Sequence, residues 1–186
     1  LYSSGSTGQP KGVTHVHGSL RATAETYGSK VLGIREGDLV YSAAKIFFAY
    51  GLGNAMTFPM SVGATTLLLA GRPTPDVVLE ILTDERPTLF CGVPTLFSAM
   101  LAALGGDDRI ESALRLCISA GEALPSAVGE GWLAKTGVDI LDGVGSTEML
   151  HIFLSNREGD VVYGTSGVAV PCLLYTSPSP RDVSSS

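Results

Sequence analysis

The chain has 186 residues, of which 45% are hydrophobic and 16% are charged, and its formal net charge is −6 at pH 7. This length and composition suit one globular unit with a sizeable core. The acidic balance argues against a basic face for nucleic acid or for an anionic membrane surface.

Three cysteines, at positions 91, 117 and 172, lack the spacing of a metal site or a redox pair. Cys91 and Cys117 lie in apolar runs and are predicted to be buried strand residues, which fits a reducing, cytoplasmic setting. The sequence begins with no signal peptide and contains no apolar run of about 18 residues. Because Leu1 is not a methionine, we expect the true N-terminus to be missing, so this absence carries little weight.

The chain begins with a run of hydroxyl residues and glycines, 2–12, around one lysine. Uncovered N–H groups at glycines form nests that bind anions, and a lysine suits phosphate oxygens. A solvated Ser/Gly linker is the alternative, but such a linker does not need the Pro-Lys-Gly end or the hydrophobic Val13 that follows. The run is not a Walker phosphate loop, because Pro10 stands where the second glycine belongs and Gly12 replaces the hydroxyl that binds Mg²⁺. We predict a phosphate-binding loop whose members are Ser3, Ser4, Gly5, Ser6, Thr7, Gly8 and Lys11.

A short strand over 13–16 and a helix over 18–32, ended by Gly33, are predicted next. His15 and His17 flank the turn between them. Two histidines beside a phosphate loop suggest a metal or acid–base role. Packing under the loop and capping of the next helix are the commoner roles for such residues.

Strand and helix patterns alternate along the rest of the chain. Strands are predicted over 38–43, 64–70 (buried), 88–91, 114–119 and 138–141. Helices are predicted over 55–62, from Pro75 with Thr74 as its N-cap, from Pro94 to the glycines at 105 and 106, and over 125–135. This alternation predicts an α/β fold of layered sheets, largely parallel and flanked by helices.

Three further segments are candidates for function. The aromatic and glycine-rich segment 45–54 is explained equally by core packing and by a ligand pocket. Two strands are followed by glycine-bearing turns, at 119–125 and 142–148. Ligands bind beyond the carboxyl ends of parallel strands, although ordinary strand-to-helix turns use the same residue types.

The run 3–12, Ser-Ser-Gly-Ser-Thr-Gly-Gln-Pro-Lys-Gly, resembles the phosphate-binding signature of the acyl-adenylate-forming enzymes, which include acyl- and aryl-CoA ligases. The segments 43–54 and 142–151 resemble the benzoate-CoA ligase branch of that superfamily. The resemblance implies that 1–171 is a partial AMP-binding domain, the central part of the large N-terminal domain of this fold. Residues 172–186 look like translated sequencing adapter and are expected to be a non-native tail, with a disordered Ser/Pro tail as the alternative.

The resemblance implies ATP and coenzyme A as substrates, Mg²⁺ as the metal, and a role for each matched residue. Asp142 would read the adenine amino group, and Glu148 would hold Mg²⁺. Val144 departs from the commonest family pattern, which has a tyrosine that stacks on adenine. The adenine would lie against Gly121, Glu122 and Ala123. The catalytic groups would be Lys11, Thr147 and Glu148, with Thr147 near the α-phosphate. The aryl pocket would be lined by Phe48, Ala49, Tyr50, Gly145 and His151.

The implied function is ATP-dependent activation of a benzoate-like acid to an acyl adenylate and then to its CoA thioester, as part of a larger enzyme. The alternatives are a ligase for hydroxybenzoate, aminobenzoate or a short fatty acid, and a non-catalytic nucleotide-binding module. In the family, the ribose-binding aspartate and the C-terminal lysine domain lie beyond the position of Pro171. We therefore expect the chain by itself to be inactive.

Overall fold

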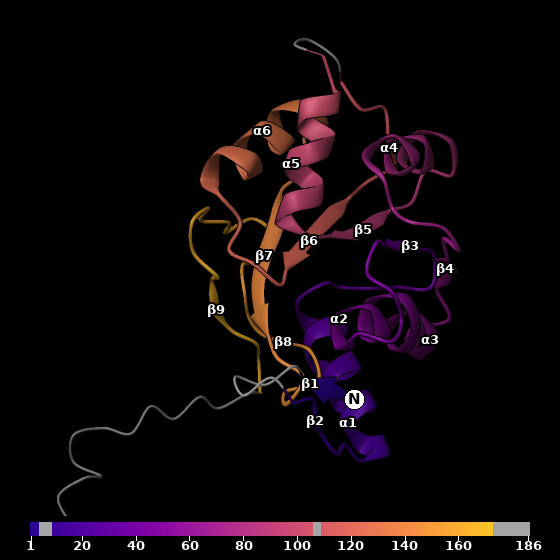
Figure 1. Cartoon of the computed structure of the whole chain (residues 1–186), viewed down its shortest axis with the longest axis vertical. Helices are drawn as coiled ribbons and strands as arrows, with labels where there is room; N and C mark the ends of the chain where they lie inside the picture. The colour runs from indigo at the N-terminus through magenta and orange to yellow at the C-terminus, as the bar shows by residue number, and fades with distance from the viewer. Residues whose placement is uncertain (4–8, 106–108, 173–186) are drawn as a thin grey trace, which may run out of the picture.

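The computed structural model describes residues 1–3, 9–105 and 109–172. Its centre is a seven-stranded sheet in the order β4-β3-β5-β6-β7-β8-β9 (Figure 1). Strands β4 to β7 of this order are parallel, and β8 and β9 continue the sheet in antiparallel pairing. The strands are β3 (Leu39–Ser42), β4 (Thr65–Leu67), β5 (Leu89–Gly92), β6 (Leu116–Ala120), β7 (Ile140–Gly145), β8 (Ile152–Ser155) and β9 (Val168–Ala169).

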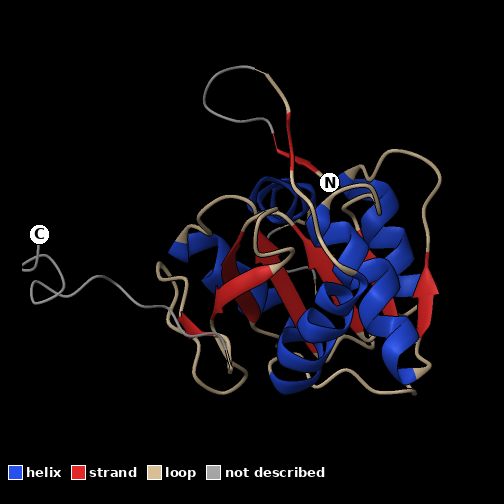
Figure 2. Ribbon diagram, turned by 90° about the horizontal axis from the view of Figure 1, so that it is seen from below, coloured by secondary structure: helices blue, strands red, loops and turns tan. Residues whose placement is uncertain are grey.

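Helices cover both faces of this sheet (Figure 2). One face carries the π-helical η1 (Ala24–Gly28) and the continuous segment α2 (Ala49–Leu52), η2 (Gly53–Thr57) and α3 (Phe58–Val62), and α1 (His17–Thr23) leads into η1 and contacts η2. The other face carries α4 (Pro75–Asp84), α5 (Pro94–Ala103) and α6 (Ser126–Thr136). A separate antiparallel hairpin pairs β1 (Tyr2–Ser3) with β2 (Lys11–Gly12).

The strands contribute alternate residues to two hydrophobic cores, because successive side chains of a strand point to opposite faces. Leu89 and Cys91 of β5 pack with the α1–α3 layer, whereas Phe90 packs with α4–α6. Cys117 of β6 lies in the second core. Both cysteines are fully buried, which confirms their predicted place in inner strands.

A buried ion pair holds together the amino ends of three strands. The Arg115 guanidinium donates to both carboxylate oxygens of Asp38, at 2.9 and 2.7 Å, and Thr88 donates to the same carboxylate at 2.8 Å. Burial pushes the pKa of Asp38 up, but these hydrogen bonds and one from the Arg35 amide outweigh it, so the pKa lies below its ordinary value. The pair fixes the end of the sheet opposite to the candidate site.

The α/β fold with a largely parallel sheet is confirmed, as are helices near each predicted position. The strand predicted over 13–16 is wrong, because the strand pairing in this region is made by β2, two residues earlier. The strand predicted over 64–70 is shorter and is not buried, because β4 ends the sheet order. Thr74 is the N-cap of α4 but makes no capping hydrogen bond through its side chain.

The segment 142–148 is also different from its prediction as a turn. Its first half continues β7 as far as Gly145, because β8 pairs with it.

The helices of the described part of the chain are each too short or too polar to cross a membrane.

Candidate active site

A pocket of about 210 Å³ lies at the carboxyl ends of β6 and β7, beside the start of α2. The structure brings all five predicted aryl-pocket residues onto its wall. Thr147 and Gly121, predicted for nucleotide binding, line it as well. The full lining is Phe48, Ala49, Tyr50, Ala120, Gly121, Gly145, Ser146, Thr147, His151 and Ile152.

A second pocket of about 210 Å³ adjoins the first, because Gly121 and Gly145 line both. It contains the three residues predicted to lie against adenine. Val144, 40% exposed, and Ser166 form part of its wall. Its lining is Gly121, Glu122, Ala123, Gly143, Val144, Gly145 and Ser166.

The glycines of β7 allow the chain segments around these pockets to approach closely. A Cβ on Gly145 would lie 2.9 Å from the His151 carbonyl oxygen, and one on Gly143 would lie 2.8 Å from Ile152 Cγ2. Both distances are shorter than normal contact. Glycine is therefore required here for the approach of β8 and the turn before it.

His151 forms the inner wall of the first pocket and is 3% exposed. Its ring packs among Tyr27, Tyr50 and Phe58 at centroid distances of 5.0, 5.8 and 4.6 Å. His151 Nε2 lies 3.3 Å from the Tyr50 carbonyl oxygen, which can only accept, so Nε2 carries the proton. Burial lowers the pKa of His151 to about 3, and the imidazole is therefore neutral near pH 7.

Tyr50 and Phe48 form the side wall and the mouth of the same pocket. The Tyr50 hydroxyl lies 3.1 Å from the carbonyl oxygens of both Gly92, at the end of β5, and Ile118, in the middle of β6, and donates to one of them, which anchors α2 to the sheet. Phe48 is 57% exposed and stands before the first residue of α2. The pocket thus has a rigid interior and an exposed aromatic edge.

Asp142 lines neither pocket and is 5% exposed. Its backbone carbonyl accepts from the Asn156 amide at 3.0 Å, and its Oδ2 accepts from the Leu124 amide at 3.4 Å. Its Oδ1 is buried, and the Ser119 hydroxyl and the Gly143 amide act on the carboxyl together with the Leu124 amide to lower its pKa, but by less than burial raises it. Burial raises the pKa of this carboxyl above its ordinary value.

The predicted phosphate loop is described only at its two ends. Ser3 and Lys11 are paired across the β1–β2 hairpin, and Lys11 is exposed. His15, on the segment after β2, has its Nε2 2.7 Å from the Thr147 carbonyl oxygen, so this segment lies against the turn that carries Thr147. The predicted loop residues Ser4, Gly5, Ser6, Thr7 and Gly8, the terminator glycine at 106 and the tail 173–186 lie outside the described residues.

Glu148 is exposed and faces a different groove, of about 520 Å³, which His15 also lines. Within residues 1–3, 9–105 and 109–172, no three His, Cys, Asp or Glu side chains come together as a metal site. The described His, Cys, Asp and Glu side chains would therefore supply at most two ligands to an Mg²⁺ ion at Glu148. Phosphate oxygens and water are suitable remaining ligands for this ion.

The sequence patterns missed five residues that line the two pockets, among them Gly143, which lies inside the 142–148 motif. Ala120 and Ile152 are strand-end residues whose side of the sheet depends on the full strand order. Ser146 lies inside a motif that was already singled out. Ser166 lies between β8 and β9, in a segment for which the sequence motifs predicted no role.

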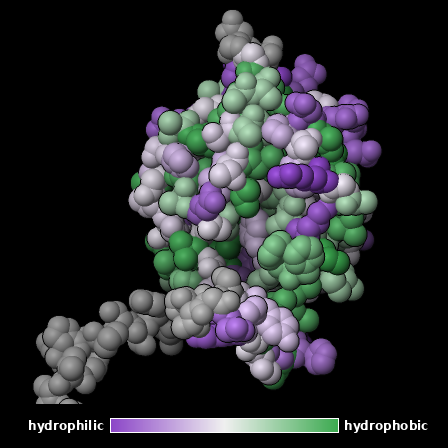
Figure 3. Space-filling model, in the orientation of Figure 1, coloured by the Kyte–Doolittle hydropathy of each residue, from purple (hydrophilic) through white to green (hydrophobic). Residues whose placement is uncertain are grey.

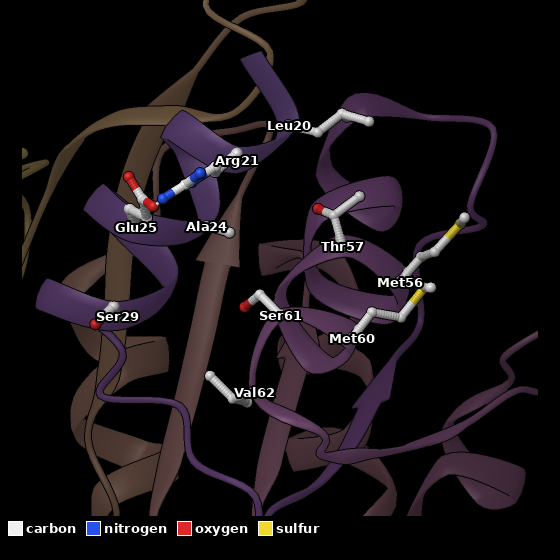
Figure 4. Close-up of a pocket in the computed structure, with 10 residues that line it drawn as sticks. All are labelled: Leu20, Arg21, Ala24, Glu25, Ser29, Met56, Thr57, Met60, Ser61 and Val62. Carbon is white, nitrogen blue, oxygen red and sulfur yellow. The ribbon is translucent and has the colours of Figure 1, made fainter. Parts of the chain in front are cut away.

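The described surface has a wider cleft, of about 660 Å³, that contains none of the predicted site residues. It separates α1 and η1 from η2 and α3 (Figure 4). Arg21 and Glu25 form an ion pair on one side, and Met56 and Met60 project from the other. Hydrophobic residues are also scattered among hydrophilic ones over the face shown in Figure 3.

Comparison with known proteins gives a match to the AMP-binding enzyme family over residues 1–175. The chain is 63% identical over 171 residues to a benzoate–CoA ligase of Thauera aromatica, covering 92% of this chain and 32% of that protein. It is 56% identical over 170 residues to a 4-hydroxybenzoate–CoA/benzoate–CoA ligase of Rhodopseudomonas palustris, covering 91% of this chain and 31% of that protein.

Two solved structures have the same fold. A benzoate CoA ligase from Burkholderia xenovorans LB400 superposes with a TM-score of 0.86 at 57% identity, covering 92% of this chain and 34% of that one. The anthranilate CoA ligase AuaEII, in complex with anthranoyl-AMP, gives 0.85 at 45% identity, covering 91% and 33%. The chain thus spans about a third of the length of these relatives. Since the family match covers nearly all of the chain, the protein belongs to the AMP-binding enzymes.

Proposed function

We propose that this chain forms the acid- and nucleotide-binding part of an AMP-forming aryl-CoA ligase whose preferred acid is benzoate or a close derivative. The observation that carries the proposal is the pair of adjoining pockets, one aromatic and one lined by glycine and backbone, with Thr147 on the wall of the first. The identity of 63% to a benzoate–CoA ligase supports the choice of acid.

The aromatic pocket suits a small, flat acid. Its volume of about 210 Å³ is below the roughly 300–1,000 Å³ of pockets for drug-sized ligands. A benzene ring would contact the rings of Tyr50 and His151. Because His151 is neutral, it offers no attraction for a carboxylate. We therefore infer that the ring enters first and the carboxylate stays at the end formed by Thr147 and Gly121.

The second pocket suits the adenine end of a nucleotide. Adenine would lie against 121–123, and the side chain of Val144 would replace the stacking ring that other family members have. Asp142 directly precedes Gly143, which lines this pocket, and would read the adenine amino group through its backbone or its side chain. A ligand bridging both pockets would resemble anthranoyl-AMP, the compound bound in the AuaEII structure.

In this arrangement the acid carboxylate attacks the α-phosphorus of ATP and releases pyrophosphate. The CoA thiol then attacks the activated carbonyl, the bond from the carbonyl carbon to the phosphate oxygen breaks, and AMP and the thiol proton leave. The protein contributes position and charge rather than a covalent nucleophile. Lys11 and the loop amides would bind phosphate oxygens, the Thr147 hydroxyl would lie near the α-phosphate, and Glu148 would hold Mg²⁺, which neutralises phosphate charge when bound. We also propose that residues 1–171 are the native domain part, that 172–186 are a non-native tail, and that the protein is cytoplasmic.

The experiment that tests this proposal is acid-dependent pyrophosphate exchange in a protein of the relatives' full length. Residues 1–171 replace the matching segment of the Thauera aromatica ligase, and benzoate, 4-hydroxybenzoate, 2-aminobenzoate and hexanoate are compared. We expect exchange with benzoate to be the most efficient and the isolated chain to be inactive. A preference for hexanoate would contradict the assigned aryl pocket.

A non-catalytic nucleotide-binding module is the competing function. Glu148→Gln in the same chimaera separates the two. A catalytic domain needs this carboxylate to hold the metal during adenylate formation, whereas a module that only binds nucleotide does not. We expect acyl-adenylate formation to fall at least about a hundredfold, in the range seen when a group that stabilises transition-state charge is removed. Unchanged adenylate formation would refute the role of Glu148.

A further inference from the structure

The hydrogen bond between His15 Nε2 and the Thr147 carbonyl oxygen joins residues 132 positions apart. At 2.7 Å it is short for a bond of this type. The carbonyl can only accept, so Nε2 carries the hydrogen and donates. Gly12 is the last residue of β2, and His15 lies three residues after it. The bond from His15 therefore fixes the position of the chain just after the predicted phosphate loop.

The turn that receives this bond has an unusual backbone. Leu150 has a φ of +66°, a left-handed conformation that is disfavoured for a branched side chain. The turn is closed by two internal bonds: the Leu150 amide donates to the Thr147 carbonyl at 3.2 Å, and the Met149 amide donates to Ser146 Oγ at 3.1 Å. A turn in a disfavoured conformation depends on such bonds to keep its shape.

The Thr147 carbonyl is therefore shared between the turn and the phosphate-loop segment. It accepts from Leu150 within the turn and from His15 outside it. Leu150 is 4% exposed, so its buried side chain fixes one end of the turn, whereas Glu148 and Met149 are exposed. The bond from His15 joins this turn to the segment that follows Lys11 and Gly12.

We propose that His15 is a positioning residue that ties the exit of the phosphate loop to the turn carrying Thr147 and Glu148. The tie keeps the groups for phosphate and for metal at a fixed separation, so that one nucleotide contacts both. This role rests on the proposed function. Because its Nε2 donates to a backbone carbonyl, only Nδ1 of this histidine is left for any other role.

The test combines amide hydrogen exchange with kinetics in the full-length chimaera. The variants are His15→Ala, which removes the donor, and His15→Gln, whose amide N–H₂ has a similar reach. Thr14→Ala, at an exposed neighbouring position, is the matched control. Exchange at the amides of Met149 and Leu150 is measured without nucleotide, and KM is measured separately for ATP and for benzoate.

We expect His15→Ala to speed exchange at these amides about fivefold, the effect of losing one hydrogen bond of typical strength. KM for ATP should rise by a similar factor while KM for benzoate stays constant. His15→Gln should restore both quantities to within about twofold of the parent protein, and Thr14→Ala should change neither.

Two results would overturn the proposal. One is unchanged amide exchange in His15→Ala. The other is faster exchange in His15→Ala that is not accompanied by both a higher KM for ATP and recovery in His15→Gln. Because the exchange measurement needs no substrate, it responds to the tie even in a protein that activates a different acid. Failure of the proposed function would instead appear as an absence of acid-dependent pyrophosphate exchange in the parent chimaera.

Discussion

Gly53 offers a sharp test of the aryl pocket, because it lies against the ring of His151. A Cβ at this position would lie 2.4 Å from His151 Cδ2, 2.7 Å from Nε2 and 2.9 Å from Phe58 Cζ. Real side chains do not approach this closely. The imidazole has little room to retreat, since the rings of Tyr27 and Phe58 pack on it at 5.0 and 4.6 Å.

Gly53→Ala should therefore push His151 into the pocket. Adding a methyl group to a packed core costs about 1–3 kcal/mol. At about 1.4 kcal/mol for each factor of ten, this strain is equivalent to a rise of about 5- to 150-fold in KM for benzoate if it is relieved into the pocket. KM for ATP should change little, because Gly53 lines neither the adenine pocket nor the groove beside Glu148.

The assay is pyrophosphate exchange in the full-length chimaera, with urea unfolding measured in parallel. The matched control is Gly18→Ala, another helical glycine, whose Cβ would meet its nearest neighbour, a Val16 methyl group, at 4.0 Å. This control should be neutral or slightly stabilising, because alanine favours a helix. If both variants had the same KM for benzoate, the placement of His151 against Gly53 in the pocket wall would be refuted.

Four further predictions concern the scaffold and the pocket. Asp38→Asn should lower the free energy of unfolding by about 3 kcal/mol in urea titrations, because Arg115 stays largely buried without its counter-charge; a loss below about 1 kcal/mol would contradict this. Folding lowers the pKa of Asp38, so the ionised carboxylate stabilises the protein fully above its unfolded pKa of about 3.9. This stabilisation is lost as pH falls through the folded pKa. When pH is lowered from about 6 to about 2.5, Asp38→Asn should therefore lose less free energy of unfolding than the parent protein. Tyr50→Phe should cost about 1 kcal/mol of stability with less than a threefold change in KM for benzoate, and a large rise in KM would show instead that the hydroxyl contacts the acid. Gly145→Ala should abolish acid-dependent pyrophosphate exchange, because its methyl group would meet the His151 backbone at 2.9 Å and displace the wall that the two pockets share. Retained activity would contradict the need for glycine in this shared wall.

The sequence predicted the parts of this molecule that depend on local pattern. The α/β alternation, the buried cysteines of β5 and β6, and the helices that begin near Pro75 and Pro94 follow from periodicity and from proline at helix starts. The residues on the wall of the aryl pocket came from a family resemblance and not from periodicity, since 45–54 was equally consistent with core packing. Their shared pocket is a feature of the structure.

What the sequence could not predict depends on partners that are distant along the chain. Asp142 to Gly145 look like a turn because two of the four residues are glycine, yet they form a strand, since β8 pairs with them and requires the space that glycine leaves. The π-helical segments η1 and η2 have no simple periodicity signal. The link from His15 to Thr147 depends on a turn whose left-handed residue is a leucine rather than a glycine.

The central claim is that one ligand spans the two adjoining pockets, and a crystal structure of the chimaera with a non-hydrolysable benzoyl-adenylate analogue tests it most directly. We predict that the phenyl ring lies between Tyr50 and His151, that the adenine lies against 121–123, and that the phosphate analogue lies beside Thr147 and the loop that ends at Lys11. An adenine ring bound away from 121–123, or a phosphate analogue out of reach of both Thr147 and Lys11, would contradict the account.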